Sequence, residues 1–470
     1  MSDGFLSRSA IVAPPGWSRW LVPPAALAVH LSIGQAYAWS NLKGALGSGP
    51  GNLGFSGTAT ALPFQLAIVM LGLSAAFGGT TVERRGPRWA MLVSTIFFSG
   101  GFGVSALGMA LSQYWLVVVG YGFLGGIGLG IGYISPVSTL MKWFADRPGM
   151  ATGIAIMGFG GGALIAAPIE TNLLATFGKS YGGFALTFLV MGIGYAIFMS
   201  VGWLLVRVPA DDWTPPRRTP GAAEPARTAA AADTADNTDG PSVSAATAIR
   251  LPQFWCLWIV LCFNVTAGIG LLERANPIYQ DFFATTAPST RIAAAAGAFV
   301  SILSLANMLG RFVWSSASDL IGRKNIYRVY LGVGAVLYLG ILTLGEGNKV
   351  LFLICALLIL SFYGAGFATI PAYLKDLFGT YQVGAIHGRL LTAWSAAGVL
   401  GPLIVNAIVD ARGDVPGPAK YTVSFTIMIV LLAVGFVANE LVRPVDRRHW
   451  VGADADRAGS APQTTKEAAR

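Results

Sequence analysis

A single arginine inside an apolar segment is the residue of this chain best placed to do chemistry. Arg311 lies within the apolar residues 293–314, eight residues before Asp319. At about 1.5 Å per residue its position is about 12 Å from that helix end, close to the middle of a hydrocarbon layer about 30 Å thick. A charge at that depth is costly, but a guanidinium there could bind a carboxylate through two hydrogen bonds, with Asn307 on the same helix face. The alternative is that Arg311 extends toward the interface or pairs with a loop acid.

The first apolar segment, residues 20–41, is unusually polar and supplies a second group of candidates. His30 lies about ten residues into it, again near mid-depth. Tyr37 and Trp39 follow, and Trp394 belongs to a later segment that could face the same cavity. We expect these side chains to complete a binding site around Arg311. For His30, a neutral imidazole hydrogen-bonded across helices is an equally supported alternative.

Acidic residues are expected only near helix ends. Glu170 and Glu273 fall near the outer ends of their segments, and Glu440 near an inner end. A central cation without a central acid favours an anionic ligand. Glu273 and Arg274 precede Asn276 and Pro277, where a helix break could form an outer gate; a simple ion pair at a helix end is the alternative.

These residues need a scaffold of spanning helices, and the composition predicts one. Of the 470 residues, 54% are hydrophobic and only 11% are charged, whereas soluble domains carry about a quarter charged residues. A spanning helix needs about 20 mostly apolar residues, and about twelve segments qualify. The predicted fold is therefore an all-α membrane protein with twelve transmembrane helices in two six-helix bundles. The segments are 20–41, 58–79, 89–111, 115–139, 150–170, 183–206, 252–273, 293–314, 326–344, 350–374, 383–409 and 422–442.

A polar segment separates the two groups of six helices. Residues 207–250 are rich in Ala, Pro, Thr and Asp, which predicts a flexible linker between a bundle over 20–206 and a bundle over 251–442. Residues 443–470 have a similar composition and are predicted to form a disordered tail. Most of the 31 Lys and Arg residues fall on one side, which predicts a cytoplasmic linker and cytoplasmic termini in an inner (plasma) membrane. This topology explains the net charge of +9 without nucleic-acid binding.

An acid–glycine–base pattern follows the second apolar segment and recurs after the eighth. The first copy spans residues 79–88 and the second spans 315–324. Matching loops in register indicate duplicated halves, as in transporters whose halves rock about a central site. A loop that only orients helices is the alternative. The residues expected to latch the two halves are Glu83, Arg84, Gly86, Arg88, Asp319, Gly322, Arg323 and Lys324.

These loops resemble the signature of the major facilitator superfamily, and the similarity covers roughly residues 20–442. Residues 34–40, 307–311 and 384–398 resemble the oxalate–formate antiporter family, which is related to the monocarboxylate transporters. The resemblance implies that Arg311 contacts a substrate carboxylate and that Tyr37 and Trp39 wall the cavity. Oxalate-moving members carry a Lys where this chain has Trp394. That departure favours a monoanion such as formate, pyruvate or lactate over oxalate.

The sequence thus predicts a monomeric carrier of small organic anions in a lipid bilayer, working by alternating access. We expect no enzymatic activity, cofactor or metal site, because clusters of central acids, nucleophiles and metal ligands are missing from the sequence. Two other functions stay open: an exporter of drugs or neutral metabolites, and a non-transporting membrane sensor. The choice among uniport, exchange and proton symport also stays open.

Overall fold

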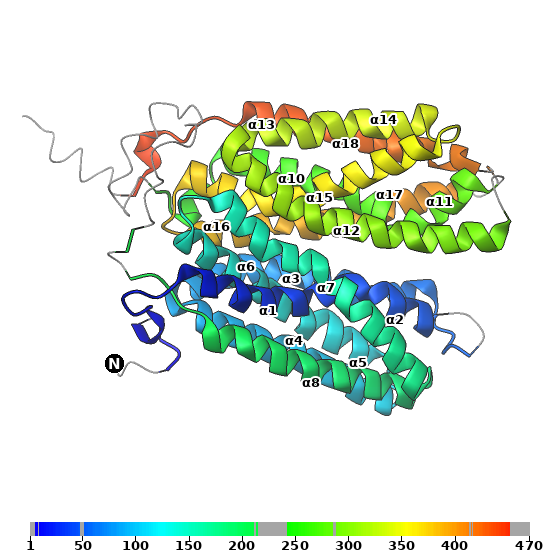
Figure 1. Cartoon of the computed structure of the whole chain (residues 1–470), viewed down its shortest axis with the longest axis horizontal. Helices are drawn as coiled ribbons and strands as arrows, with labels where there is room; N and C mark the ends of the chain where they lie inside the picture. Colours follow the sequence, from blue (N-terminus) through cyan, green and yellow to red (C-terminus); the bar gives the residue numbers. More distant parts are fainter. Residues whose placement is uncertain are drawn as a thin grey trace, which may run out of the picture.

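The computed structural model of the chain is almost entirely helical, with two groups of helices lying side by side. It describes residues 5–7, 9–47, 51–210, 213–214, 242–284, 288–412, 415 and 417–451. Figure 1 shows helices α1–α8 in one layer and α10–α18 in the other. Most of the predicted linker and tail lies outside the described residues.

The N-terminal group contains five uninterrupted crossings and one interrupted crossing. The fourth of the six crossings, formed by α5 and α6, contains a π-helical stretch, η4. The bounds are α1 Val22–Ile33, η3 Gly34–Ala38, α2 Trp39–Leu46, α3 Gly57–Arg85, α4 Pro87–Ala110, α5 Trp115–Val117, η4 Val118–Gly125, α6 Gly126–Trp143, α7 Pro148–Phe177 and α8 Tyr181–Leu205.

The C-terminal group follows the short helix α9 (Ala245–Ala248), with its π-helical stretch η6 in the third crossing. Its helices are α10 Pro252–Glu273, α11 Ala275–Phe283, α12 Ser289–Ile321, α13 Arg323–Arg328, η6 Val329–Val333, α14 Gly334–Leu344, α15 Lys349–Phe378, α16 Val383–Leu390, α17 Thr392–Ala411, η7 Gly417–Tyr421 and α18 Thr422–Leu441.

Eleven helices within the described ranges are long and apolar enough to cross a membrane. They correspond to all the predicted spans except the first. The segment predicted as one helix over 20–41 is divided by the 3₁₀ turn η3 into α1 and α2. The prediction of one uninterrupted helix was wrong there, although the predicted two-bundle fold is confirmed.

The interruption of the first crossing coincides with a very close approach of two backbones. Gly34, in η3, lies against the backbone of Phe159 on α7, so that a Cβ atom at Gly34 would overlap it. Gly162, one turn further along α7, is in turn packed against Gly34. Small residues permit such contacts in membrane bundles, where close packing replaces the hydrophobic effect between helices. This packing fixes η3 against α7.

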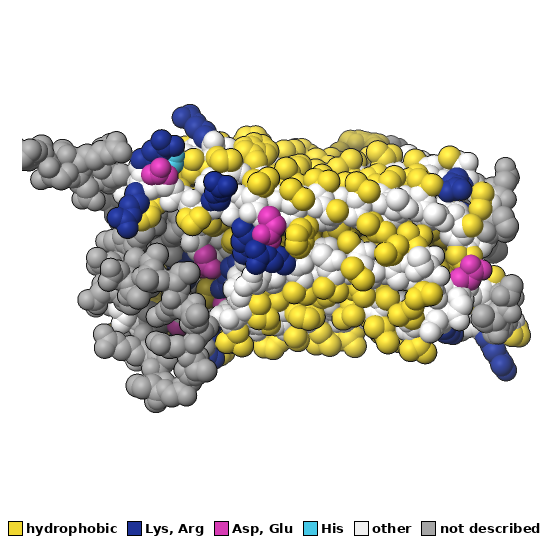
Figure 2. Space-filling model, turned by 90° about the horizontal axis from the view of Figure 1, so that it is seen from above, with side chains coloured by type: hydrophobic (Ala, Val, Ile, Leu, Met, Phe, Trp, Pro, Cys, Tyr) yellow, Lys and Arg dark blue, Asp and Glu magenta, His cyan; other side chains and the backbone are white. Residues whose placement is uncertain are grey.

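The two ends of the bundle differ from its middle. Figure 2 shows hydrophobic side chains over the middle of one face, with charged side chains mainly toward the ends. Exposed apolar side chains such as Phe77, Ile197 and Val336 fit contact with lipid. At one end Val12 pairs with Val208, and Val451 N–H donates to Ser242 at 2.8 Å. We name this the linker end, because both flanks of residues 207–250 lie there.

The packing at Gly34 generates a stability prediction. Gly34→Ala should destabilise the protein by about 1–3 kcal/mol, the usual cost of overpacking. Gly44→Ala is the matched control, because a Cβ atom there meets open space on α2. Thermal unfolding of the purified variants in detergent measures both. An unchanged melting temperature for Gly34→Ala would contradict the close approach.

Candidate anion-binding site

Arg311 lies on α12 at the contact between the two groups of helices and is fully buried. Its Nε donates to Asn307 Oδ1 at 3.2 Å, on the same helix. Its Nη1 donates to the Ile156 carbonyl at 3.4 Å, and its Nη2 to the Tyr37 hydroxyl at 3.5 Å. The last two partners belong to the opposite half. These bonds are long, so they hold the guanidinium in place only weakly.

Aromatic rings enclose the guanidinium of Arg311. Its central carbon lies 5.5 Å from the Phe367 ring centre, 5.7 Å from that of Phe159 and 5.9 Å from that of Tyr37. Ring faces at this range attract a cation. Among the described residues, no Asp or Glu oxygen lies within 4.0 Å of Arg311. The structure therefore places a buried positive charge between the halves, and no acid within the described part of the chain pairs with it.

Tyr37 connects the two halves beside this charge. Its hydroxyl lies 3.0 Å from the hydroxyl of Tyr363 on α15. The ring of Tyr37 packs edge-on against Phe159, with ring centres 5.1 Å apart. Tyr37 belongs to η3, so the interruption of the first crossing is what directs this side chain toward Arg311.

Next to this cluster lie three buried polar side chains whose polar atoms lack hydrogen-bond partners within the described part of the chain. They are the Tyr133 hydroxyl, the Trp394 indole N–H and both ring nitrogens of His387. The Tyr133 ring lies 5.4 Å from Trp394 and 5.8 Å from His387. Trp394 also lies 4.4 Å from Phe367 and 5.3 Å from Phe159, centre to centre. Unpartnered buried donors are costly unless a ligand or water meets them.

Two residues predicted for the site lie elsewhere. Trp39 donates its indole N–H to the Thr60 carbonyl at 2.9 Å and packs on Tyr121, inside the N-terminal half. Residues two positions apart do not share a helix face, so Trp39 points away from the side on which Tyr37 meets Arg311. His30 contacts the Ala155 carbonyl at 2.5 Å and the Tyr133 carbonyl at 3.1 Å. It therefore lies behind the Tyr133 ring, on which it stacks, rather than beside Arg311.

Phe159, Phe367 and His387 were missing from the predicted site. The sequence carries no signal for the two phenylalanines, because a buried aromatic residue on an apolar helix is usually a packing residue. His387 offered a weak signal, since a histidine within an apolar segment is uncommon. Its place between the halves becomes evident only from the packing of α16 against α3 and α6.

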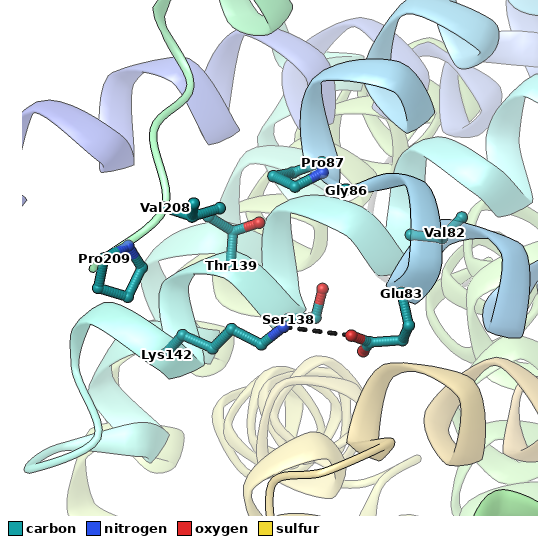
Figure 3. Close-up of a pocket in the computed structure, with 9 residues that line it drawn as sticks. All are labelled: Val82, Glu83, Gly86, Pro87, Ser138, Thr139, Lys142, Val208 and Pro209. Carbon is teal, nitrogen blue, oxygen red and sulfur yellow. Dashed lines mark hydrogen bonds and ion pairs between the residues drawn. The ribbon is translucent and has the colours of Figure 1, made fainter. Parts of the chain in front are cut away.

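At the linker end, the acid of each repeated loop accepts a hydrogen bond from the backbone of the opposite half. Glu83 accepts hydrogen bonds from Lys142 at 3.2 Å and from Gly384 N–H, across the boundary, at 3.1 Å. Figure 3 shows Lys142 reaching Glu83 beside a pocket lined by Val82, Glu83, Gly86, Pro87, Ser138, Thr139, Lys142, Val208 and Pro209. This pocket lies at the linker end, away from Arg311.

The second acid meets the first turn of α7. Asp319 accepts hydrogen bonds from the N–H groups of Gly149 and Met150, each at 2.9 Å. It also pairs with Arg323 at 2.5 Å, and Arg323 reaches Asp376 at 3.1 Å. A carboxylate at a helix N-terminus satisfies free N–H groups and complements the helix dipole.

The bases and glycines of the loops match between the halves. Gly86 and Gly322 adopt nearly the same left-handed conformation, with φ of 88° and 89°, at the turn after the acid. Arg88 donates to the carbonyls of Trp203 and Leu204 at the end of α8. Lys324 donates to the carbonyls of Glu440 and Val442 at the end of α18. Each base thus binds the end of the last helix of its own half.

The remaining predicted residues have other surroundings. Arg84 is exposed at the linker end. Arg274 lies at the break between α10 and α11, where its Nε donates to Asn406 at 2.6 Å within the same half. The side chain of Glu273, the other half of the predicted outer gate, lies outside the described residues.

Comparison with known proteins places this arrangement in a family. The Major Facilitator Superfamily profile matches residues 25–402 and 293–462. The oxalate:formate antiporter of Oxalobacter formigenes is 28% identical over 92% of this chain and 94% of its own. Apicoplast pyruvate carrier 1 of Toxoplasma gondii is 26% identical over 73% of this chain and 68% of its own. The uncharacterized transporter YhjX of Escherichia coli is 25% identical over 79% of this chain and 83% of its own.

Solved structures agree on the fold. The E. coli fucose:proton symporter FucP superposes with a TM-score of 0.64 at 12% identity, covering 91% of this chain and 98% of that one. The human organic anion transporter MFSD10 gives a TM-score of 0.64 at 15% identity, and the superposition covers 91% of this chain and 100% of that one. With two six-helix bundles, paired signature loops and a profile match over most of its length, the chain is a membrane transporter of the Major Facilitator Superfamily.

Proposed function

We propose that the protein carries small carboxylate anions by alternating access, with Arg311 binding the carboxylate. The observation that carries this proposal is a fully buried guanidinium at the boundary between the halves, with no acid beside it among the described residues. Such a charge is costly in a membrane interior. A carboxylate would neutralise it and accept two parallel hydrogen bonds.

The surroundings of Arg311 favour a small cargo. Aromatic rings from both halves lie within 6 Å of its guanidinium carbon. Such close walls suit an anion of a few heavy atoms rather than a drug-sized solute. The names of two relatives, an oxalate:formate antiporter and a pyruvate carrier, support this cargo class.

The neutral donors near Arg311 favour a monoanion. Trp394 occupies the place where the oxalate-moving members are expected to hold a second cation, and it offers only an indole N–H. Together with the Tyr133 hydroxyl, it could bind an uncharged oxygen at the other end of the cargo. Pyruvate and lactate carry such an oxygen, and formate is small enough to use Arg311 alone.

The contacts between the halves support a state closed at the linker end. Three hydrogen bonds between the halves lie at that end. Asp319 accepts from the first turn of α7, Glu83 accepts from Gly384 N–H, and Lys375 donates to the Ala145 carbonyl at 3.0 Å. A further hydrogen bond between the halves lies deeper in the bundle, where the Ser395 hydroxyl donates to the Ile68 carbonyl at 2.8 Å. Release toward the linker end, which we place in the cytoplasm of an inner-membrane protein, requires these contacts to break.

Replacement of Arg311 tests the proposal directly. In proteoliposomes, Arg311→Ala should lower formate and pyruvate counterflow at least about 30-fold, since losing one partner of a buried charge contact costs about 2–5 kcal/mol. Arg311→Lys should also be impaired, because an ammonium lacks the planar fork. Arg291→Ala is the matched control, because Arg291 is exposed on the same helix.

Three outcomes separate the proposal from its alternatives. Counterflow lost in Arg311→Ala but kept in Arg291→Ala, with equal protein in the membrane, supports it. Transport of an uncharged solute by Arg311→Ala, without exchange of any carboxylate by the unaltered protein, would instead indicate an exporter of neutral compounds. Absence of counterflow for every solute would favour a sensor.

Trp394→Phe tests the neutral donor. The substitution keeps an aromatic ring but removes the indole N–H, whose hydrogen bond should contribute about 0.5–1.5 kcal/mol. The half-saturating concentration of pyruvate should therefore rise several-fold, while that of formate changes little. Competition between the two anions in counterflow measures the ratio of their half-saturating concentrations. An equal change for both anions would contradict the role proposed for the Trp394 indole N–H.

Asp319→Asn tests the contacts at the linker end. The amide loses the ion pair with Arg323 and the charge at the α7 N-terminus, so the protein should open more often at that end. Spin labels at the exposed positions Arg84 and Tyr381, in a background without the three native cysteines, report this distance by electron-spin resonance. Glu346→Gln, an exposed acid, is the control. An unchanged distance distribution in Asp319→Asn would show that this acid does not hold the halves together.

A further inference from the structure

A buried acid lies in the N-terminal half, apart from the Arg311 site. Glu170, on α7, is fully buried, and its Oε1 accepts a hydrogen bond from Gln35 Nε2 at 2.7 Å. Its Oε2 has no partner within the described part of the chain. An ionised carboxylate can accept about four hydrogen bonds, so a single one leaves the charge poorly stabilised. A neutral carboxyl suits this place better.

The groups around Glu170 supply no compensating charge. Gln35 in turn accepts from the Tyr121 hydroxyl at 3.2 Å. Tyr121 packs on Phe102, and Phe102 on Tyr195, whose buried hydroxyl is also without a partner among the described residues. The elements packed against α7 carry further titratable groups, including His30 on α1, Tyr37 on η3, Lys43 on α2, Tyr181 on α8, and Arg291 and Arg311 on α12. Among the described residues, none of these forms a hydrogen bond or ion pair with Glu170.

The 3₁₀ turn η3 connects this acid to the anion site. Gln35 and Tyr37 are two residues apart in η3; the first binds Glu170 and the second contacts Arg311 and Tyr363. Glu170 lies ten residues beyond Gly160, which packs against Arg311. This places the acid about 15 Å from the anion site along α7, toward the end opposite the linker.

We propose that Glu170 is the proton-binding site of a carboxylate–proton symporter, coupled to the anion site through η3. The proposal rests on the proposed function. A proton taken from water forms the O–H bond of the Glu170 carboxyl, and an ionised Glu170 re-forms when the proton is released. The protonated acid needs no water at Oε2, so Gln35, and hence η3, keeps its packed position, where Tyr37 touches Arg311. Ionisation would draw water to the carboxylate and loosen η3, so proton and anion bind together and move in the same direction.

Coupling is tested with purified protein in liposomes that contain a pH-sensitive dye. An inward pyruvate gradient should acidify the lumen in the unaltered protein, above the background of protein-free liposomes. Glu170→Gln retains the bond to Gln35 but cannot carry the proton. It should still exchange pyruvate within about twofold of the unaltered rate while its proton influx falls to background, and Glu170→Asp should recover part of the influx. Glu346→Gln, an exposed acid, should behave as the unaltered protein.

A second measurement does not depend on transport. Infrared spectra of the detergent-purified protein at neutral pH should show the C=O stretch of a protonated carboxyl, which disappears in Glu170→Gln. Proton influx in Glu170→Gln equal to that of the unaltered protein, or no infrared difference between the two, would overturn the proposal. If the unaltered protein exchanges no carboxylate, the proposed function fails, and the infrared difference alone decides whether Glu170 holds a proton.

Discussion

A buried guanidinium between two half-molecules, which no acid of the described residues pairs with, is the constraint on which the rest of this structure depends. Arg311 is fully buried and contacts ring faces, an amide oxygen and a carbonyl. Several of these groups belong to the opposite half, so bringing the halves together and removing water from the charge are one event. An anion at this point lowers the cost of that event. In the proposed function, ligand binding and closure of the halves are thereby energetically linked.

At the linker end, the acids of the repeated loops satisfy backbone N–H groups at the boundary between the halves. Asp319 and Glu83 both accept backbone N–H groups of the opposite half, so each satisfies donors that would otherwise face the boundary unpaired. These bonds are exposed to water once the halves part, and water can replace them at small net cost. In the proposed alternating-access cycle, the contacts at the linker end would thus be strong enough to define a closed state and weak enough to be broken.

Much of this architecture could be predicted because it depends on periodic or repeated features. The spans followed from hydropathy, the duplication from the spacing of acid, glycine and base, and Arg311 from the rarity of charge in an apolar segment. Trp39 lies away from Arg311 because residues two positions apart, such as Tyr37 and Trp39, do not share a helix face. The 3₁₀ turn over 34–38 was not predicted, because no residue pattern there indicates it. Phe159 and Phe367 were not predicted because, in sequence, an aromatic residue that contacts a buried charge looks the same as one that only packs helices.

The two bases that bind helix ends have a consequence for how the chain is built. Arg88 ties the start of α4 to the last carbonyls of α8, and Lys324 ties α13 to the last carbonyls of α18. Each of these bonds joins two helices of the same half. In the proposed cycle, each half would therefore keep these contacts while the boundary opens. Two separate polypeptides, divided between residues 215 and 241, would each retain its own bonds of this kind and should assemble into the same carrier without a covalent connection.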